Sequence, residues 1–338
     1  MKQITIADIA KEAGVSKATV SRVLSKPNLV SEKTREKILL VINKYSFTPN
    51  TLAQGLAGMP TKNIGVMVDE LANDYYIELT GGIDSILFQE NYTVQLMSTR
   101  WIPERELQGV RSMILNRVDG ILISPVSAES DAITLLKKSG IPYILINCTS
   151  SDPEVSYVCC DNHEGGRLIA EHVNSLGREQ AIVVPVSDHK TLIERVDAFC
   201  KYLDSTHIRL IKAPIARHYQ DGYNLVSLLV DQNAIDTKKT TLFVGNDYIA
   251  MGMISRLFEL NIPIPEQVSV IGFDDIRIAS LCRVPLTTVS QSIHTMGRLA
   301  ALALINMIRH NQDNLSYRHI IDPQLIIRES TSLVPCKD

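Results

Sequence analysis

The chain is 338 residues long, with a formal net charge of −3 and 45% hydrophobic residues, a composition typical of packed globular proteins. No apolar run reaches the roughly 18 residues of a membrane-spanning helix, which argues against a helical membrane protein. The charge is unevenly divided, because residues 1–62 hold ten Lys and Arg against four Asp and Glu, whereas the remainder holds 24 against 33. A basic N-terminal segment followed by an acidic remainder indicates that only the N-terminal segment approaches phosphate groups.

Residues 5–25 have the pattern of two short helices joined by a tight turn. Thr5, followed three residues later by Asp8, predicts a capping box at the start of the first helix. Gly14 supplies the turn because it accepts a positive φ without steric cost, and Ser16 is a natural N-cap for the second helix. This arrangement predicts a helix-turn-helix, whose first helix has apolar residues along one face: Ile6, Ile9, Ala10 and Ala13.

The second predicted helix exposes residues that can read DNA bases. The first turn of a recognition helix reaches base edges in the major groove. Lys17 and Arg22 can donate to guanine O6 and N7, and Ala18 can contact a thymine methyl group. A helical hairpin with a solvated charged face would look similar, but the residues that follow argue against it. The expected reading face is Lys17, Ala18, Ser21 and Arg22.

Ser31 is expected to cap a third helix that closes a small core and ends before Pro49. Residues 50–58 could form one or two helical turns, but they are too poor in apolar side chains to fold alone. We therefore expect residues 50–58 to become ordered only through contacts with something outside the segment. The buried positions expected in the third helix are Ile38, Leu39, Val41, Ile42 and Tyr45.

Residues 5–25, followed by Pro49-Asn50 and Leu52-Ala53-x-x-Leu56, resemble the headpiece and hinge of the lac repressor/galactose repressor family. The resemblance implies that the hinge folds on operator DNA, with Leu56 wedged into the minor groove and Ala53 beside it. The central Gln54-Gly55 departs from the family's usual Arg-Ser. The DNA-binding residues implied are Thr5, Ser16, Lys17, Ala18, Ser21, Arg22, Asn50, Ala53 and Leu56.

After a polar linker, near-continuous apolar strands alternate with amphipathic helices, which predicts parallel sheets covered on both faces. The series is too long for one small sheet, so we expect two doubly wound lobes. Strands are expected at 64–68, 93–97, 120–123, 143–146, 181–184, 242–244 and 268–272. Helices are expected near 76–90, 103–116, 129–138, 163–176, 190–204, 219–232, 248–260 and 291–309.

The family resemblance extends through this region, on Asp119-Gly120-Ile121, on Asn246-Asp247 and on residues 265–275. It implies a periplasmic-binding-protein-like core, whose two lobes are joined by crossovers near 147–160, 285–292 and 318–326. The expected organisation is a helix-turn-helix headpiece over 1–48, a hinge and linker over 49–62, and a two-lobed effector-binding and dimerisation core over 63–338.

Polar side chains that follow strands are the candidates for effector binding, because ligands of open α/β sheets bind at the carboxyl ends of strands. Arg195 offers a fixed fork of donors, and Asn246 and Asp274 can accept from hydroxyls. Arg195 could instead form a surface ion pair, and Tyr75 and Tyr76 could belong to the core rather than stack on a sugar. The expected effector-binding residues are Asp69, Asn73, Tyr75, Tyr76, Arg195, Asn246, Phe273, Asp274 and Gln291.

No catalytic or metal-binding pattern is found in the sequence. It has no Gly-x-Ser-x-Gly, Walker or His-Glu-x-x-His motif, and its six cysteines form no Cys-x-x-Cys pair. We expect neither metal nor cofactor. With no signal-peptide pattern before the first helix, we expect a cytoplasmic protein with reduced thiols.

These observations favour a bacterial transcription regulator, most often a repressor in the resembling family, that binds a pseudo-palindromic operator as a homodimer. The stretch after residue 331 is too short for a helical zipper, so we expect no tetramer. The effector is expected to be a sugar or sugar derivative. The open alternatives are a regulator that depends on a corepressor or protein partner, a solute receptor without a DNA role and, most remotely, an enzyme.

Overall fold

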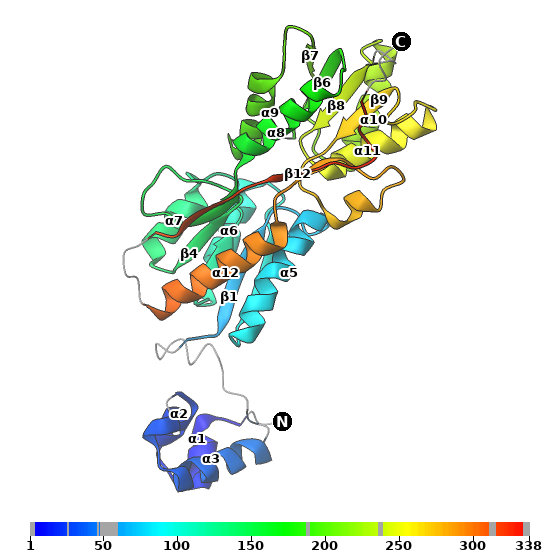
Figure 1. Cartoon of the computed structure of the whole chain (residues 1–338). Helices are drawn as coiled ribbons and strands as arrows, with labels where there is room; N and C mark the ends of the chain where they lie inside the picture. The colour runs from blue at the N-terminus through cyan, green and yellow to red at the C-terminus, as the bar shows by residue number, and fades with distance from the viewer. Residues whose placement is uncertain are drawn as a thin grey trace.

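The computed structural model describes residues 4–25, 27–45, 47, 60–186, 190–235, 239–310 and 316–333. The described residues form a small helical headpiece and two α/β lobes (Figure 1). The predicted fold class is confirmed. Within this part of the chain, none of the helices combines the length and apolarity that a membrane-spanning segment requires. The predicted hinge residues Asn50, Ala53 and Leu56 lie outside the described residues.

The headpiece begins with the predicted helix-turn-helix. Thr5 and Asp8 form the capping box, with the Thr5 N–H donating to Asp8 Oδ2 at 2.9 Å. Gly14 has a φ of +63° at the end of the first helix, and Ser16 Oγ accepts from the Thr19 N–H at 3.1 Å. The elements of the headpiece are α1 (Ile6–Ala13), α2 (Lys17–Ser25), a 3-10 turn η1 (Pro27–Leu29) and α3 (Glu32–Lys44).

The prediction for the inner face of α3 was partly wrong. Ile38 is fully buried in the headpiece core, with Val41 and Ile42 packed beside it. Leu39 and Tyr45 are exposed. Leu39 falls outside the stripe at i, i+3 and i+4 that faces the other two helices, whereas Tyr45 continues that stripe but lies beyond the last residue of α3, where its hydroxyl donates to Glu12. Ser31 stands at the N-cap, but its hydroxyl makes no cap hydrogen bond.

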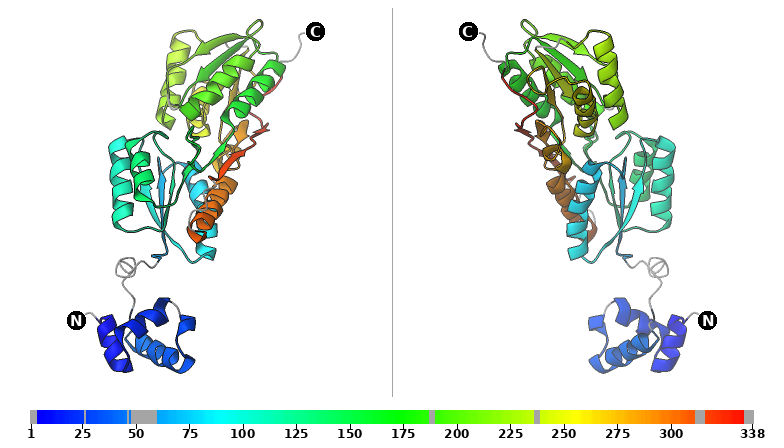
Figure 2. Two further views of the ribbon diagram at one scale, coloured as in Figure 1. Left: turned by 90° about the vertical axis from the view of Figure 1, so that its left-hand side faces the viewer. Right: turned by 90° about the vertical axis from the view of Figure 1, so that its right-hand side faces the viewer.

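The first lobe is a six-stranded parallel sheet in the order β11-β5-β4-β3-β1-β2. Helices α5 and α12 cover one face, and α6 and α7 cover the other (Figures 1 and 2). The strands are β1 (Asn63–Val68), β2 (Thr93–Ser98), β3 (Gly120–Ile123), β4 (Tyr143–Ile146), β5 (Tyr157–Cys160) and β11 (Arg318–Ile321). The helices are α5 (Asp74–Gln89), α6 (Pro103–Leu115), α7 (Asp131–Ser139) and α12 (Ile293–Arg309).

The second lobe is a four-stranded parallel sheet in the order β7-β6-β8-β9. Helices α8 and α9 pack together on one face, and α10 and α11 pack together on the other (Figure 2). The strands are β6 (Gln180–Val184), β7 (Arg209–Lys212), β8 (Thr240–Val244) and β9 (Val268–Ile271). The helices are α8 (Asn162–Ser175), α9 (Lys190–Tyr202), α10 (Tyr219–Asp231) and α11 (Asp247–Glu259), with a 3-10 turn η2 (Arg277–Ser280).

The chain passes between the lobes three times. A short antiparallel pair, β10 (Thr288–Ser290) and β12 (Gln324–Ile326), forms two of the connections. The segments predicted as crossovers at 147–160 and 318–326 contain β5 and β11, which belong to the first sheet. The crossings therefore follow these strands directly, and the carboxyl ends of both sheets face each other across the space between the lobes.

The linker from the headpiece is anchored where it enters the first lobe. Asp119 accepts hydrogen bonds from the Thr61 N–H at 2.8 Å, the Thr61 hydroxyl at 3.0 Å and the Lys62 N–H at 2.9 Å. The Lys62 ammonium lies 4.1 Å from the centre of the Tyr92 ring. These contacts hold residues 61 and 62 against the first lobe at the start of β1.

Candidate effector cleft and DNA-reading face

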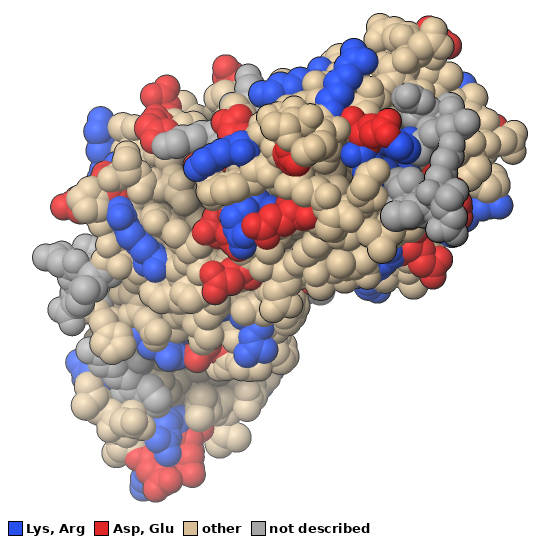
Figure 3. Space-filling view, turned by 45° about the horizontal axis from the view of Figure 1, so that its top comes forward, with Lys and Arg blue, Asp and Glu red and all other residues tan. Residues whose placement is uncertain are grey.

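The predicted reading face of α2 is open to solvent. Lys17, Ala18 and Arg22 are exposed and Ser21 is half-buried, whereas Val20 and Val23 hold the opposite face in the core. On the face of the core in Figure 3, Lys and Arg are interspersed with Asp and Glu, so no continuous basic surface forms there.

The hydroxyls of Thr5 and Ser16 take part in hydrogen bonds that cap α1 and α2. They support the placement of the reading helix, and their contact with DNA stays a prediction.

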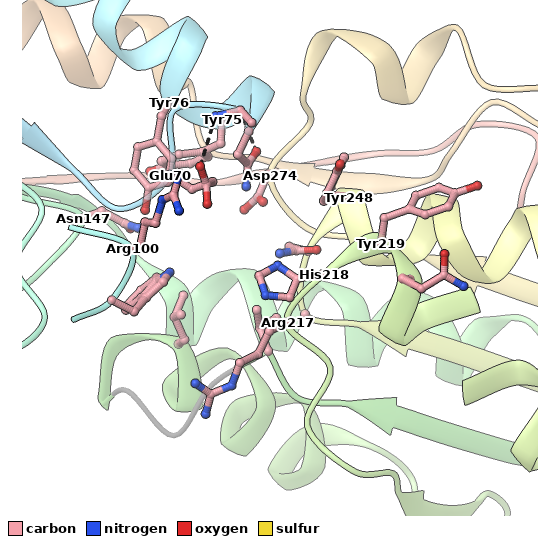
Figure 4. Close-up of a pocket in the computed structure, with 18 of the residues that line it drawn as sticks. Glu70, Tyr75, Tyr76, Arg100, Asn147, Arg217, His218, Tyr219, Tyr248 and Asp274 are labelled. Atoms are coloured by element: carbon pink, nitrogen blue, oxygen red, sulfur yellow. Dashed lines mark hydrogen bonds between the residues drawn. The ribbon is translucent and has the colours of Figure 1, made fainter. Parts of the chain in front are cut away.

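A cavity of about 670 Å³ lies between the lobes, within the size range of small-molecule pockets. Figure 4 shows side chains from both lobes converging on it. Six of the nine effector residues predicted from sequence line this cavity, although their contact with a ligand stays a prediction: Asn73, Tyr75, Tyr76, Arg195, Asn246 and Asp274.

Arg195 is held rigidly in the wall of the cleft and is only 1% exposed. Its Nε donates to Asn162 Oδ1 at 3.0 Å, and its Nη1 donates to the Gly245 carbonyl at 2.7 Å. Its guanidinium carbon lies 3.8 Å from the centre of the Phe273 ring. The alternative that Arg195 forms a surface ion pair is therefore wrong.

Asp274 is the buried partner of this arginine, with Oδ1 3.5 Å from Arg195 Nη1. The same oxygen accepts from Gln291 Nε2 at 2.5 Å. Burial raises the pKa of Asp274 to about 8, although Arg195 favours its charged form. Asp274 has a φ of 126°, a backbone conformation that side chains rarely adopt and that fixes the carboxyl at the cleft wall.

Asp69, Phe273 and Gln291 do not line the cavity but lie behind its walls. Asp69 accepts hydrogen bonds from the Tyr76 hydroxyl, from Ser124 at 3.1 Å and from Thr99 at 3.3 Å. Burial raises its pKa to about 7. In this structure the three side chains position Tyr76, Arg195 and Asp274 rather than face a ligand.

The two predicted asparagines each cap a helix that begins at the cleft. Asn73 Oδ1 accepts from the Tyr75 N–H at 3.0 Å, and Asn246 Oδ1 accepts from the Ile249 N–H at 2.9 Å. Asn246 was expected to accept from a ligand hydroxyl. Its oxygen already accepts one hydrogen bond from the helix, so acceptance from a ligand stays a prediction, and its amide N–H groups can also donate.

Several cleft residues were missed by the sequence reasoning. Arg100 and Trp101 follow β2, and Asn147 follows β4, so the rule that selected Asp69 would also have found them. Arg217 and His218 come from the loop after β7, a strand that was not predicted because two of its four residues are exposed.

A helix-turn-helix headpiece joined to a two-lobed core with a ligand-sized cleft defines a class of effector-responsive DNA-binding regulators. The chain belongs to the lacI family of bacterial regulatory proteins, as the resemblance predicted. The sequence model of that family matches residues 5–50, and a periplasmic-binding-protein-like domain matches residues 170–331.

Curated relatives are similar to this chain over nearly its whole length. The HTH-type transcriptional repressor PurR of Haemophilus influenzae (strain PittEE) is 30% identical over 98% of this chain and 99% of its own. PurR of Vibrio vulnificus (strain CMCP6) is 27% identical over the same shares. The chain is thus similar to transcriptional repressors along its full length.

The solved structures of similar proteins agree. The lac repressor dimer bound to operator and the anti-inducer ONPF is 25% identical, with a TM-score of 0.83 over 98% of this chain and 100% of that one. A lacI-family regulator from Enterococcus faecium with bound ribose is 28% identical, with a TM-score of 0.72 over 81% of this chain and 100% of that one. The chain is a DNA-binding transcriptional regulator with an effector-binding core.

Proposed function

We propose that the protein is a homodimeric repressor that acts on a pseudo-palindromic operator in the cytoplasm, and that a small effector bound between the lobes controls its affinity for DNA. The observation that carries this proposal is the physical connection of the two sites. The linker from the helix-turn-helix headpiece is hydrogen-bonded through Asp119 to the first lobe, which forms one wall of the cleft. A ligand that changes the lobe angle can therefore bias the headpiece.

A dimer is supported by the apolar side chains at one edge of the first lobe. Ile77 and Phe88 on α5 are 57% and 78% exposed, and Leu115 at the end of α6 is 79% exposed. Between these helices lies the edge strand β2, where Leu96 is also exposed. Apolar surface of this kind marks a protein interface, and the lac repressor to which the chain is similar binds operator as a dimer.

The test is selection of binding sites from random duplex DNA, followed by titration of the selected site and of a random sequence. We expect Arg22→Ala to weaken binding to the selected site by about 1–3 kcal/mol and to affect random DNA much less, because a base contact carries the selectivity. Lys33→Ala is the matched control, since it removes the same charge from an exposed position on α3.

Equal losses on both DNAs would show that Arg22 contacts only phosphate. Failure to enrich any sequence would contradict the proposed function itself. Sedimentation equilibrium should give the mass of two chains, and a tetrameric mass would overturn the predicted assembly.

A further inference from the structure

The cleft walls carry more positive than negative groups. Arg195 and Asp274 are both buried, with Arg195 Nη1 3.5 Å from Asp274 Oδ1. Three arginines line the cavity, Arg100, Arg195 and Arg217, against the two carboxyl groups of Glu70 and Asp274. Arg100 belongs to the first lobe and Arg217 to the second, so that the two arginines come from opposite walls (Figure 4).

The backbone at Arg100 adopts an unusual and well-defined turn. Its φ is +53° and that of Trp101 is +58°, so two successive residues adopt the left-handed conformation that side chains disfavour. The Arg100 N–H donates to the Asp69 carbonyl at 2.7 Å, and the Trp101 N–H donates to Thr99 Oγ1 at 3.3 Å. The Arg100 side chain has no ion pair or hydrogen bond with any other described residue. The turn thus fixes the backbone of Arg100 at the cavity wall, and its exposed guanidinium is open to a ligand.

The neutral groups of the cleft add to this positive character. Helices α5 and α11 begin at Asn73 and Asn246, both of which line the cavity and cap their helices through Oδ1. Helix N-termini carry partial positive charge and favour anions. The remaining amide N–H groups of both asparagines are donors as well.

One polar atom in the cavity wall is an acceptor that lacks a hydrogen-bond donor. Asn147 lines the cavity, and its Oδ1 is buried without a hydrogen-bond partner among the described residues. A ligand hydroxyl would satisfy it, because an unpaired buried acceptor is costly. The hydroxyls of Tyr75 and Tyr76 donate to Met296 and Asp69, so neither hydroxyl hydrogen is left to donate to a ligand.

We propose that the effector is an anionic carbohydrate, a sugar acid or a sugar phosphate, whose acid group pairs with the Arg100 guanidinium. This inference rests on the proposed function, because it concerns the ligand of the same cleft. Arg100 is then the residue that separates acidic from neutral sugars, since a guanidinium binds carboxylate and phosphate through paired hydrogen bonds that a neutral sugar cannot accept equally well.

The experiment is thermal unfolding of the full chain with ligand sets that share one carbon skeleton, at equal ionic strength. The sets are glucose, gluconate and glucose 6-phosphate; galactose, galactonate and galactose 6-phosphate; and ribose, ribonate and ribose 5-phosphate. We expect one acidic member to raise the midpoint by several degrees when it is in large excess over its dissociation constant, and its neutral counterpart to have little effect. The comparison of carboxylate with phosphate identifies the source of the charge.

Two variants make the assignment specific. Arg100→Gln should weaken binding of the stabilising acid at least tenfold, while the unfolding midpoint without ligand stays close to that of the natural chain. Arg105→Gln removes the same charge from an exposed position on α6 outside the cavity and should leave binding unchanged. Equal losses in both variants would mean that general charge, not Arg100, attracts the ligand, and would overturn the proposal.

The proposal is also overturned if a neutral sugar stabilises as well as its acidic counterpart, or if no acidic member shifts the midpoint. Neither result touches the proposed repressor function, which is tested by selective DNA binding of the protein with and without each of these ligands. Loss of that selectivity would instead refute the proposed function, whichever sugar binds.

Discussion

The carboxyl group of Asp69 should make the stability of the first lobe depend strongly on pH. It is fully buried and receives hydrogen bonds from three side chains. Burial nevertheless raises its pKa from 3.8 to about 7. The stabilisation it contributes is present below its unfolded pKa of 3.8 and is lost as the pH rises through about 7.

The size of the effect follows from the shift in pKa. Each pH unit between the two values is worth about 1.4 kcal/mol, and the slope falls off as the folded carboxyl itself titrates near pH 7. A rise from pH 5 to pH 7 should therefore lower the free energy of unfolding by about 2 kcal/mol through this group alone. Asp69→Asn keeps an acceptor for Tyr76 and removes the titration. The variant should therefore gain stability relative to the natural chain over this interval, and the gain should level off above pH 7.

The measurement is urea unfolding at a series of pH values, followed by fluorescence. Trp101 is the only tryptophan in the sequence, and its backbone N–H donates to Thr99, which in turn donates to Asp69, so its emission reports on unfolding close to this region. Buried Asp247 and Asp274 also titrate with raised pKa values, and the difference between variant and natural chain removes their contribution. Asp84→Asn, at an exposed position on α5, is the control. A constant difference between Asp69→Asn and the natural chain from pH 5 to pH 8 would refute the reasoning.

Two further predictions concern packing and are checked by urea unfolding. Gly82→Ala should lower the free energy of unfolding by about 1–3 kcal/mol, because its Cβ would lie 2.2 Å from the His294 carbonyl oxygen on α12. Adjacent Gly81→Ala meets no atom within 4 Å and should raise the free energy of unfolding by up to about 1 kcal/mol. A change of the same sign in both variants would contradict the close approach of α5 and α12. Arg195→Lys keeps the charge but loses the hydrogen bonds to Asn162 and Gly245, and should cost about 2 kcal/mol or more; an unchanged unfolding midpoint would show that the buried network contributes little.

The sequence was most informative where local chemistry determines structure. The capping box at Thr5, the turn at Gly14 and the alternation of apolar strands with helices were all predicted correctly, because each depends on neighbouring residues. The long helices and buried strands of both lobes were found for the same reason. Short strands with exposed residues, such as β7 and β12, were missed, since their apolar pattern is interrupted.

The site was predicted less completely, because position in sequence does not fix side-chain direction. Asp69 and Asn73 both follow β1, yet Asp69 turns inward to Tyr76 while Asn73 lines the cavity. Phe273 and Asp274 are adjacent, and only the second reaches the cleft wall. Such distinctions depend on the packing of both lobes, which no local pattern encodes.

The anchor at Asp119 sets how motion of the core reaches the headpiece. Because both Thr61 and Lys62 are hydrogen-bonded to the first lobe, the linker cannot move relative to that lobe at these two residues. A rotation of the lobe displaces this attachment point by an amount that grows with its distance from the cleft. We therefore expect a small closure around a ligand to be magnified before it reaches the DNA, and an insertion between Pro60 and Thr61, ahead of the anchor, to weaken the response while leaving both binding sites intact.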